Sequence, residues 1–202
     1  METAQPETQI QPEPVAEQPA NWKRFVLDIL ETLVLAVVLY FGINAVSARV
    51  RVDGFSMRPT LQDGEYILVN KLAYKTGEPH RGDIVVFIFP VDPTEDLIKR
   101  VIGLPGESVS VHSGVVTVNG NSLTEPYIAS PPAYDGDWVV PDGQLFVLGD
   151  NRNDSRDSHQ WGLLPIENVI GRAVLIYWPP KEWQVINHTA KNVVEQKLLS
   201  SK

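Results

Sequence analysis

The sequence predicts a mainly β domain, built as a barrel or a sandwich, behind one N-terminal transmembrane helix. The uncharged stretch from Thr32 to Ala48 is nearly long enough to cross a bilayer core, which needs roughly 20 apolar residues. Beyond it, short runs rich in Val, Ile, Phe and Tyr alternate with turn residues, as expected of strands. Because no helical segments alternate with these runs, a parallel βαβ fold is not expected.

Composition narrows the classes of function. The 202 residues suffice for one domain with an anchor and a tail. A net charge of −8 argues against a nucleic-acid partner, which usually requires a basic face. The absence of cysteine excludes disulfides, cysteine zinc sites and thiol catalysis. His80, His112 and His188 are scattered without metal-ligand spacing, so no metal or cofactor is expected.

Four segments are expected along the chain. Residues 1–21 form an acidic, proline-rich leader that we expect to be disordered. Residues 22–48 form the transmembrane helix, 49–180 the β-rich domain and 181–202 a polar tail. A short helix is possible over Val193–Leu199, and the tail has no assigned role.

The apolar span extends from Phe25 to Ala48 when its first two turns are included. Asp28 and Glu31 then lie near the headgroups, where the positive end of the helix dipole favours them. The alternatives are a buried core helix or a cleaved signal peptide, but no small-residue cleavage site precedes an obvious mature start.

Basic residues flank this span on both sides. Lys23 and Arg24 precede it, and Arg49 and Arg51 follow it. The positive-inside rule therefore assigns no orientation.

The β-rich region shows clear strand and turn signals. Asn119-Gly120 predicts a type I′ hairpin turn within residues 115–121, because both turn positions need positive φ. Pro141-Asp142-Gly143 predicts a turn, and residues 124–137 a long loop. The expected strands are Tyr66–Val69, Ile84–Phe89, Leu145–Leu148 and Val174–Trp178.

Two segments make chemical sense together. Gly54–Leu61 presents the hydroxyl of Ser56 on a proline-limited turn, and Ile98–Gly103 places Lys99 among residues of strong β-propensity. A serine hydroxyl is a weak nucleophile unless a base takes its proton. A lysine becomes such a base when burial lowers its pKa from about 10.4. The pair suggests a Ser–Lys dyad.

A third segment, Gly149–Gly162, is dense in short polar side chains. Such side chains bond to local backbone and fix loop shape. The segment is therefore expected to support the site from behind.

The three segments, in this order behind an apolar span, resemble the type I signal (leader) peptidases from roughly Phe25 to Pro180. The resemblance implies that Ser56 is the nucleophile and Lys99 the general base, with Arg100 structural. It also implies that Ser155 orients the lysine through a hydrogen bond. Asp157 would stabilise the loop by pairing with a basic group.

The chain departs from the family's commonest pattern at several positions. Asn153-Asp154 stands where Asp-Asn is more usual, and His159 stands where an arginine is frequent. Asp157 could therefore pair with Arg152 or with His159, and His159 is a support residue by resemblance although it could look like a base. Where some members have an oxyanion-binding serine, this chain has Gly54. The backbone N–H of Ser56 is then the expected oxyanion donor.

Substrate residues follow from the same resemblance. The residue before the cut would contact Met57, Leu61 and Ile98, and the residue two positions upstream would contact Val50, Val52 and Val86. Bulky walls leave small pockets, so small residues are expected at −1 and −3. A plain core role is the alternative for each of these six side chains.

The sequence is thus interpreted as a membrane-bound serine endopeptidase that removes signal peptides from exported preproteins, with membrane lipid as a second partner. The resemblance implies a single-pass protein of the bacterial plasma membrane or a thylakoid-like membrane, with its N-terminus cytoplasmic. Formal glycosylation sequons begin at Asn153 and Asn187, and a glycan at Asn153 would block the site, which argues against the endoplasmic reticulum. The rivals are a self-cleaving repressor-type protease, which would need a DNA-binding segment, and a catalytically silent scaffold. The oligomeric state is not indicated.

Overall fold

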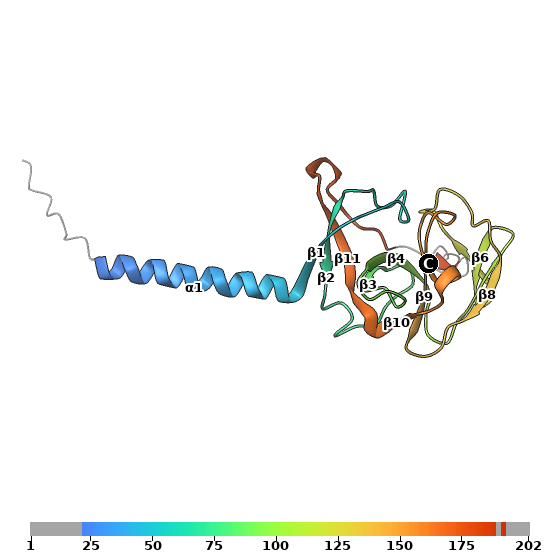
Figure 1. Ribbon diagram of the computed structural model, residues 1–202, viewed down its shortest axis with the longest axis horizontal. Helices are drawn as coiled ribbons and strands as arrows, with labels where there is room; N and C mark the ends of the chain where they lie inside the picture. Colours follow the sequence, from blue (N-terminus) through green and yellow to red (C-terminus); the bar gives the residue numbers. More distant parts are fainter. Residues whose placement is uncertain (1–21, 189–190, 193–202) are drawn as a thin grey trace, which may run out of the picture. The chain divides into compact units, whose positions relative to one another are not determined.

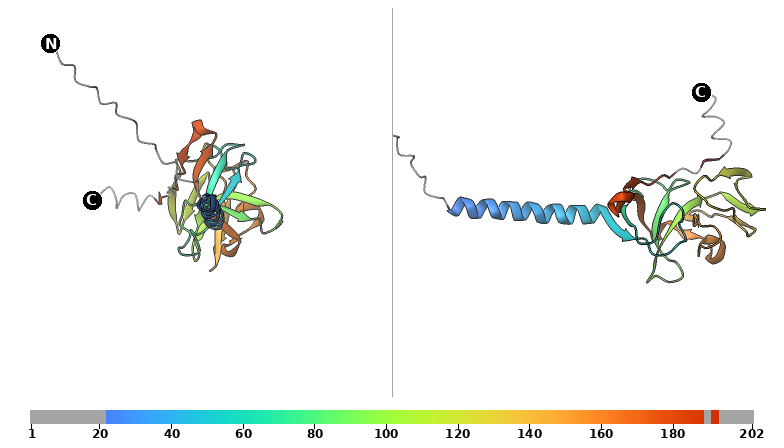
Figure 2. Two further views of the ribbon diagram at one scale, coloured as in Figure 1. Left: turned by 90° about the vertical axis from the view of Figure 1, so that its left-hand side faces the viewer. Right: turned by 90° about the horizontal axis from the view of Figure 1, so that it is seen from above.

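The computed structural model describes residues 22–188 and 191–192, so the expected leader and the helix expected over 193–199 lie outside the described residues. The chain divides into two compact units, residues 1–41 and 42–202. Helix α1 (Trp22–Val46) crosses this division and begins at the expected residue. None of its side chains is buried, and it is long and apolar enough to cross a membrane. Figure 2 shows it as one unbroken helix.

Residues 42–202 are here called the β unit, and its described residues are mainly antiparallel sheet, as the sequence predicts (Figure 1). An eight-stranded sheet and a five-stranded sheet lie beside each other. The first contains, in spatial order, β1 (Ser47–Arg51), β2 (Tyr66–Asn70), β11 (Val169–Trp178), β3 (Ile84–Ile88), β4 (Asp96–Gly103), β9 (Gln144–Leu148) and β10 (Leu164–Pro165), with β12 (Gln184–Val185) on β11. The second contains β13 (Lys191–Asn192), β7 (Asn121–Thr124), β6 (Val115–Val118), β5 (Ser108–His112) and β8 (Gly136–Val139). The helical turns are α2 (Ser158–Trp161), η1 (Ile166–Asn168) and η2 (Pro180–Glu182).

Local signals explain most of these strands. Asn119 and Gly120 both have positive φ, and they join β6 to β7 as the turn chemistry requires. The loop expected over 124–137 is largely present, although its last residues belong to β8. Strand β1 begins at Ser47, two residues before the expected start of the domain, because it pairs along its length with β2.

Two strand edges meet at the functional region. β1 is the first strand of its sheet. β9 pairs with β4 from Arg100 onward, so the segment Asp96–Lys99 has a described partner only on its β3 side. Unpaired edges of this kind can accept an added peptide strand.

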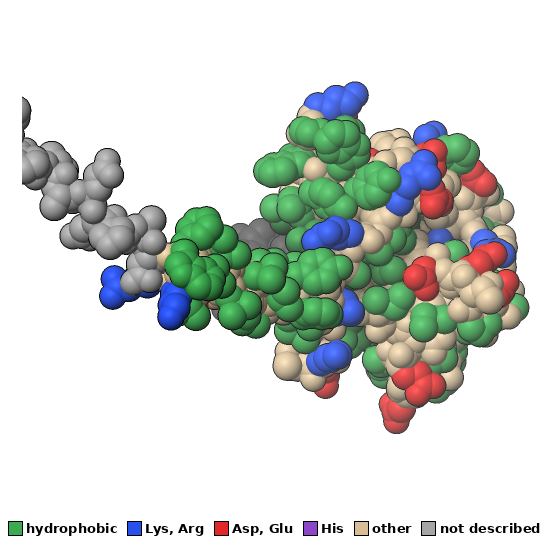
Figure 3. Space-filling view, turned by 60° about the vertical axis from the view of Figure 1, so that its left-hand side comes forward, with side chains coloured by type: hydrophobic (Ala, Val, Ile, Leu, Met, Phe, Trp, Pro, Cys, Tyr) green, Lys and Arg blue, Asp and Glu red, His purple; other side chains and the backbone are tan. Residues whose placement is uncertain are grey.

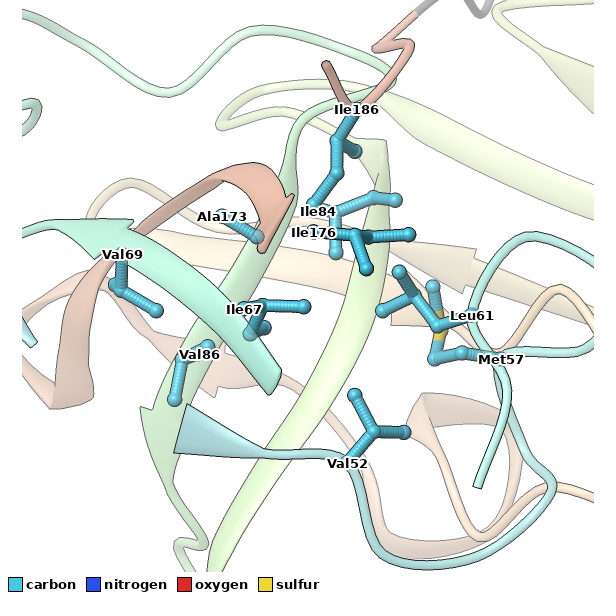
Figure 4. Packing of buried hydrophobic residues seen from close by; sticks show 10 residues of the cluster. All are labelled: Val52, Met57, Leu61, Ile67, Val69, Ile84, Val86, Ala173, Ile176 and Ile186. Carbon is cyan, nitrogen blue, oxygen red and sulfur yellow. The ribbon is translucent and has the colours of Figure 1, made fainter. Parts of the chain in front are cut away.

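The core of the first sheet includes Ile186, which comes from the expected tail (Figure 4). Ile186 is 4% exposed, and its N–H donates to the carbonyl of Val174. His188 Nδ1 accepts the N–H of Ile84 at 3.1 Å. The domain therefore continues at least ten residues beyond Trp178, because this segment fills one side of the core.

Candidate active site

Ser56 lies on a turn that is held by the apolar core and by the loop 149–162. Met57 is 2% exposed and Leu61 is fully buried, so the apolar core holds the turn on both sides of Pro59. The loop 149–162 supplies two hydrogen bonds to the same turn. Asn151 N–H donates to the carbonyl of Ser56 at 3.0 Å, and its Nδ2 donates to the carbonyl of Phe55 at 3.2 Å.

Lys99 reaches Ser56 from β4. Its Nζ lies 2.9 Å from Ser56 Oγ and 2.9 Å from the carbonyl oxygen of Ile98. The side chain is 3% exposed. Burial is the main reason that the pKa of Lys99 falls from 10.5 to about 8, since a charged ammonium is disfavoured away from water. Nucleophile and base are therefore within hydrogen-bond reach, and the base is easily made neutral.

Ser155 lies close to this pair, but its expected hydrogen bond is absent. The hydroxyl is buried, and among the described residues Oγ has no hydrogen-bond partner. Gly149 makes room for it: a Cβ there would lie 2.2 Å from Ser155 Oγ and 2.5 Å from the carbonyl oxygen of Ser56. The absence of a side chain at Gly149 thus lets the loop approach the nucleophile turn closely.

The partner of Asp157 is His159, which settles the alternative left open by the sequence. Asp157 is fully buried. Its Oδ1 lies 2.6 Å from His159 Nδ1, and its Oδ2 accepts the N–H of Gly149 at 2.9 Å. The imidazole stacks on Tyr134 with a centroid distance of 3.9 Å. His159 therefore occupies the supporting place implied by the resemblance.

Arg152 pairs instead with Glu125, a residue that sequence reasoning missed. Two of its guanidinium nitrogens donate to the carboxylate at 2.8 and 2.6 Å. The sequence carries little signal for this pair, because Glu125 lies in an expected loop with no periodicity.

Arg100 joins all three segments through Asp150. It donates to both carboxylate oxygens of Asp150 at 2.7 Å, and the hydroxyl of Thr60 also donates to Asp150. Arg100 and Asp150 are almost fully buried, so the structural place implied for Arg100 agrees with its geometry. Removing one partner of such a pair would leave an uncompensated buried charge.

A groove of about 280 Å³ runs past Ser56 and Lys99, between β1 and β4. Of the six side chains expected to contact substrate, four line this groove: Val50, Val52, Met57 and Ile98. Leu61 and Val86 do not line it in the described structure. Both are fully buried in the core cluster that also contains Val52 and Met57.

No cluster of three or more metal-ligating side chains occurs within residues 22–188 and 191–192.

Residues 23–178 match the family model described as signal peptidase, peptidase S26. The chain is 44% identical over 181 residues to a probable signal peptidase I-2 of Synechocystis, covering 84% of this chain and 81% of that protein. It is 45% identical over 180 residues to a signal peptidase I of Leptolyngbya laminosa, covering 83% and 86%. A crystal structure of a signal peptidase I from Enterococcus faecalis is 34% identical, with a TM-score of 0.44, and covers 47% of this chain and 96% of that chain.

Proposed function

This chain belongs to the signal peptidase I family, serine endopeptidases that cleave signal peptides from secreted preproteins, and on that premise we propose that Ser56 is its nucleophile and Lys99 its general base. The observation that carries the assignment is the 2.9 Å separation of Lys99 Nζ and Ser56 Oγ, with the lysine buried. The chain is anchored in the membrane by its one N-terminal helix.

The proposed reaction begins with neutral Lys99. Its lone pair accepts the Ser56 hydroxyl proton while Oγ attacks the scissile carbonyl. The resulting ammonium then gives the proton to the departing amine, which becomes the new N-terminus of the mature protein. Water hydrolyses the acyl-enzyme, with Lys99 again accepting a proton. The carbonyl of Ile98 holds the amine in place throughout.

The oxyanion that forms during attack would be bound by backbone rather than by a side-chain hydroxyl. Gly54 has no side-chain donor, and its φ of +98° suits glycine. The N–H of Ser56 is the proposed donor. Ser155 and Asp157 are proposed as supporting residues, Ser155 beside the nucleophile turn and Asp157 through its bond to Gly149.

The groove between β1 and β4 is the proposed binding site for an extended signal-peptide segment. The facing edges can each hydrogen-bond to an added strand. Val50, Val52, Met57 and Ile98 line the groove, and these bulky walls leave room for small side chains at −1 and −3.

Membrane lipid is the second proposed partner. The hairpin between β11 and β12 projects from the β unit (Figure 1), and it carries exposed apolar side chains on neighbouring strands. Trp178 is 53%, Trp183 67% and Val185 80% exposed. Figure 3 shows hydrophobic side chains, in green, gathered on this face. Tryptophan favours the membrane–water interface, so this hairpin is proposed to lie at the headgroups. An N-terminus in the cytoplasm and a catalytic unit on the opposite side complete the proposal, in a bacterial plasma membrane or a thylakoid-like membrane.

The direct test incubates the purified full-length protein in detergent with a preprotein and sequences the new N-terminus. Cleavage after an Ala-x-Ala-type segment is expected, and Ser56→Ala should abolish it without unfolding the protein. Full cleavage by the Ser56→Ala variant would refute the assignment of the nucleophile. A serine-reactive β-lactam-type inhibitor should label Ser56, which separates this enzyme from a silent scaffold.

A further inference from the structure

Arg156 lies between buried residues of the loop 149–162 but extends its own side chain outward. Its neighbours Ser155 and Asp157 are 7% and 0% exposed, whereas the Arg156 side chain is 52% exposed. The guanidinium lies against the connection between β3 and β4. A half-exposed arginine can simply be a solvated surface residue, but Arg156 also makes specific contacts.

Those contacts fasten the loop to the strand that carries Lys99. Arg156 forms an ion pair with Glu95, which immediately precedes β4. Its guanidinium carbon lies 4.6 Å from the ring centroid of Phe89, a distance at which a cation is attracted to the ring. Trp161, from the far end of the same loop, packs its ring edge-on against Phe89 at 5.5 Å. Phe89 is thus contacted both by the middle of the loop, through Arg156, and by its end, through Trp161.

The β3–β4 connection, which Arg156 contacts, is closed by backbone hydrogen bonds. Phe89 N–H donates to the carbonyl of Glu95 at 2.9 Å, and Ile88 pairs with Asp96 at the start of β4. A displacement of Glu95 would therefore be transmitted along β4 toward Lys99. Arg156 is positioned to limit such a displacement.

The charge of Arg156 also acts on Lys99. Burial is the first cause of the lowered pKa of Lys99. Asp157 and, more weakly, Asp150 raise this pKa, while Arg156 lowers it. Both carboxylates are already bonded to other groups, Asp157 to His159 and Gly149 and Asp150 to Arg100 and Thr60. Arg156 therefore partly offsets the negative charge behind the lysine.

We infer that Arg156 is a positioning residue of the proposed Ser56–Lys99 reaction, which holds the loop 149–162 on the β3–β4 connection next to the strand that carries Lys99. The inference rests on the proposed function. The contacts of Arg156 and its charge should affect the reaction in different ways. Loss of the clamp lowers the maximal rate, whereas loss of the charge moves the pH dependence.

The test compares Arg156→Gln, Arg156→Lys and Glu95→Gln in the full-length protein, by measuring kcat/KM against pH on a signal-peptide substrate. Arg156→Gln should move the ascending limb to higher pH by about half a unit, because a half-exposed charge is partly screened. On that limb kcat/KM should fall about threefold. Arg156→Lys should restore most of the wild-type limb. Glu95→Gln removes the ion pair of the clamp but keeps the cation, so its plateau should fall without an upward shift.

An unshifted limb in Arg156→Gln, an equal upward shift in Glu95→Gln, or a failure of Arg156→Lys to restore the limb would overturn the inference. A second measurement does not depend on cleavage. Labelling by acetic anhydride across a pH series, quantified for the peptide containing Lys99, titrates the amine directly. The same upward shift in Arg156→Gln is expected there, even if the preprotein assay refutes the proposed function.

Discussion

Nζ of Lys99 contacts Oγ of Ser56 at 2.9 Å, although the two residues come from a buried strand and a surface turn. The nearby carboxylates form no ion pair with the amine. Asp150 pairs with Arg100 and Asp157 with His159. The charged form of Lys99 is therefore desolvated without a direct counter-ion. This favours the neutral amine, which can act as a base.

Lys99→Met should abolish cleavage and raise the stability of the β unit at neutral pH. The folded-state pKa of about 8 lies below the ordinary value of 10.5, so below pH 8 protonated Lys99 destabilises the folded state. A difference of this size corresponds to a few kcal/mol. Chemical denaturation of both proteins at pH 7 measures the effect.

The wild-type free energy of unfolding should rise between about pH 8 and pH 10.5, because there the unfolded state binds the additional proton. That rise should be absent in Lys99→Met. Lys99→Arg serves as the matched control, since its guanidinium stays protonated and leaves the enzyme inactive without the gain. A Met variant less stable than wild type would contradict the argument.

The pH dependence of kcat/KM should show an ascending limb near the lowered pKa of Lys99, about 8. This profile reports the free enzyme's essential base. Steady-state rates on a short signal-peptide substrate provide the measurement. A limb that levels off only near pH 10 would mean that the working lysine is solvated.

Gly54→Ser should outperform Gly54→Ala on the same peptide. The φ of Gly54 is +98°, and no heavy atom lies within 4 Å of an added Cβ. Both variants thus carry a similar backbone cost, and they differ by one hydroxyl. A single oxyanion donor is worth about 10²–10³ in kcat, and a freely rotating hydroxyl should deliver less. Equal kcat values would leave backbone N–H groups as the donors.

Ile186→Ala should destabilise the β unit by about 2–5 kcal/mol, the usual cost of emptying a buried isoleucine site. Ile186 packs into the core of the first sheet, whereas its neighbour Val185 is 80% exposed. Val185→Ala is therefore the control, with an expected change within about 0.5 kcal/mol. Similar denaturation midpoints for the two variants would show that this segment does not complete the core.

Trp183→Ser should slow cleavage severalfold when enzyme and preprotein share a vesicle, and leave cleavage of a short peptide in detergent unchanged. Trp183 is 67% exposed on the hairpin proposed to meet lipid. Val139→Ser, on the second sheet and 71% exposed, is the matched control. An equal loss of rate in both assays would place the effect in the catalytic site rather than at the membrane.

Local chemistry made much of the fold predictable. Asn119-Gly120 specified its turn, and apolar runs such as Ile84–Ile88 specified their strands. Strand order was not accessible, because β11 pairs with both β2 and β3 across large separations in sequence. The extra pairing of β12 was missed for a similar reason. One buried residue, Ile186, gives no periodic signal.

For the candidate site too, some features were predictable from the sequence and others depended on the three-dimensional fold. The proximity of Ser56 and Lys99 was expected from the resemblance, not from periodicity, since both faces of β4 are buried beyond Ile98. Which carboxylate binds which cation depended on three-dimensional placement, so Glu125 was not anticipated as the partner of Arg152. Leu61 and Val86 were expected in the pocket from the resemblance, and the sequence could not separate pocket from core because apolar side chains suit both.

The location of Ile186 in the first core also constrains the order of events during synthesis. Val52, Ile84 and Ile186 share one apolar cluster (Figure 4), so the cluster cannot be complete until Ile186 has been synthesised and has left the ribosome. The nucleophile turn rests on this cluster through Met57 and Leu61. A nascent chain that already contains both Ser56 and Lys99 therefore still lacks a residue of the cluster that supports the nucleophile turn, so the proposed active site is not fully supported until Ile186 has packed into the cluster.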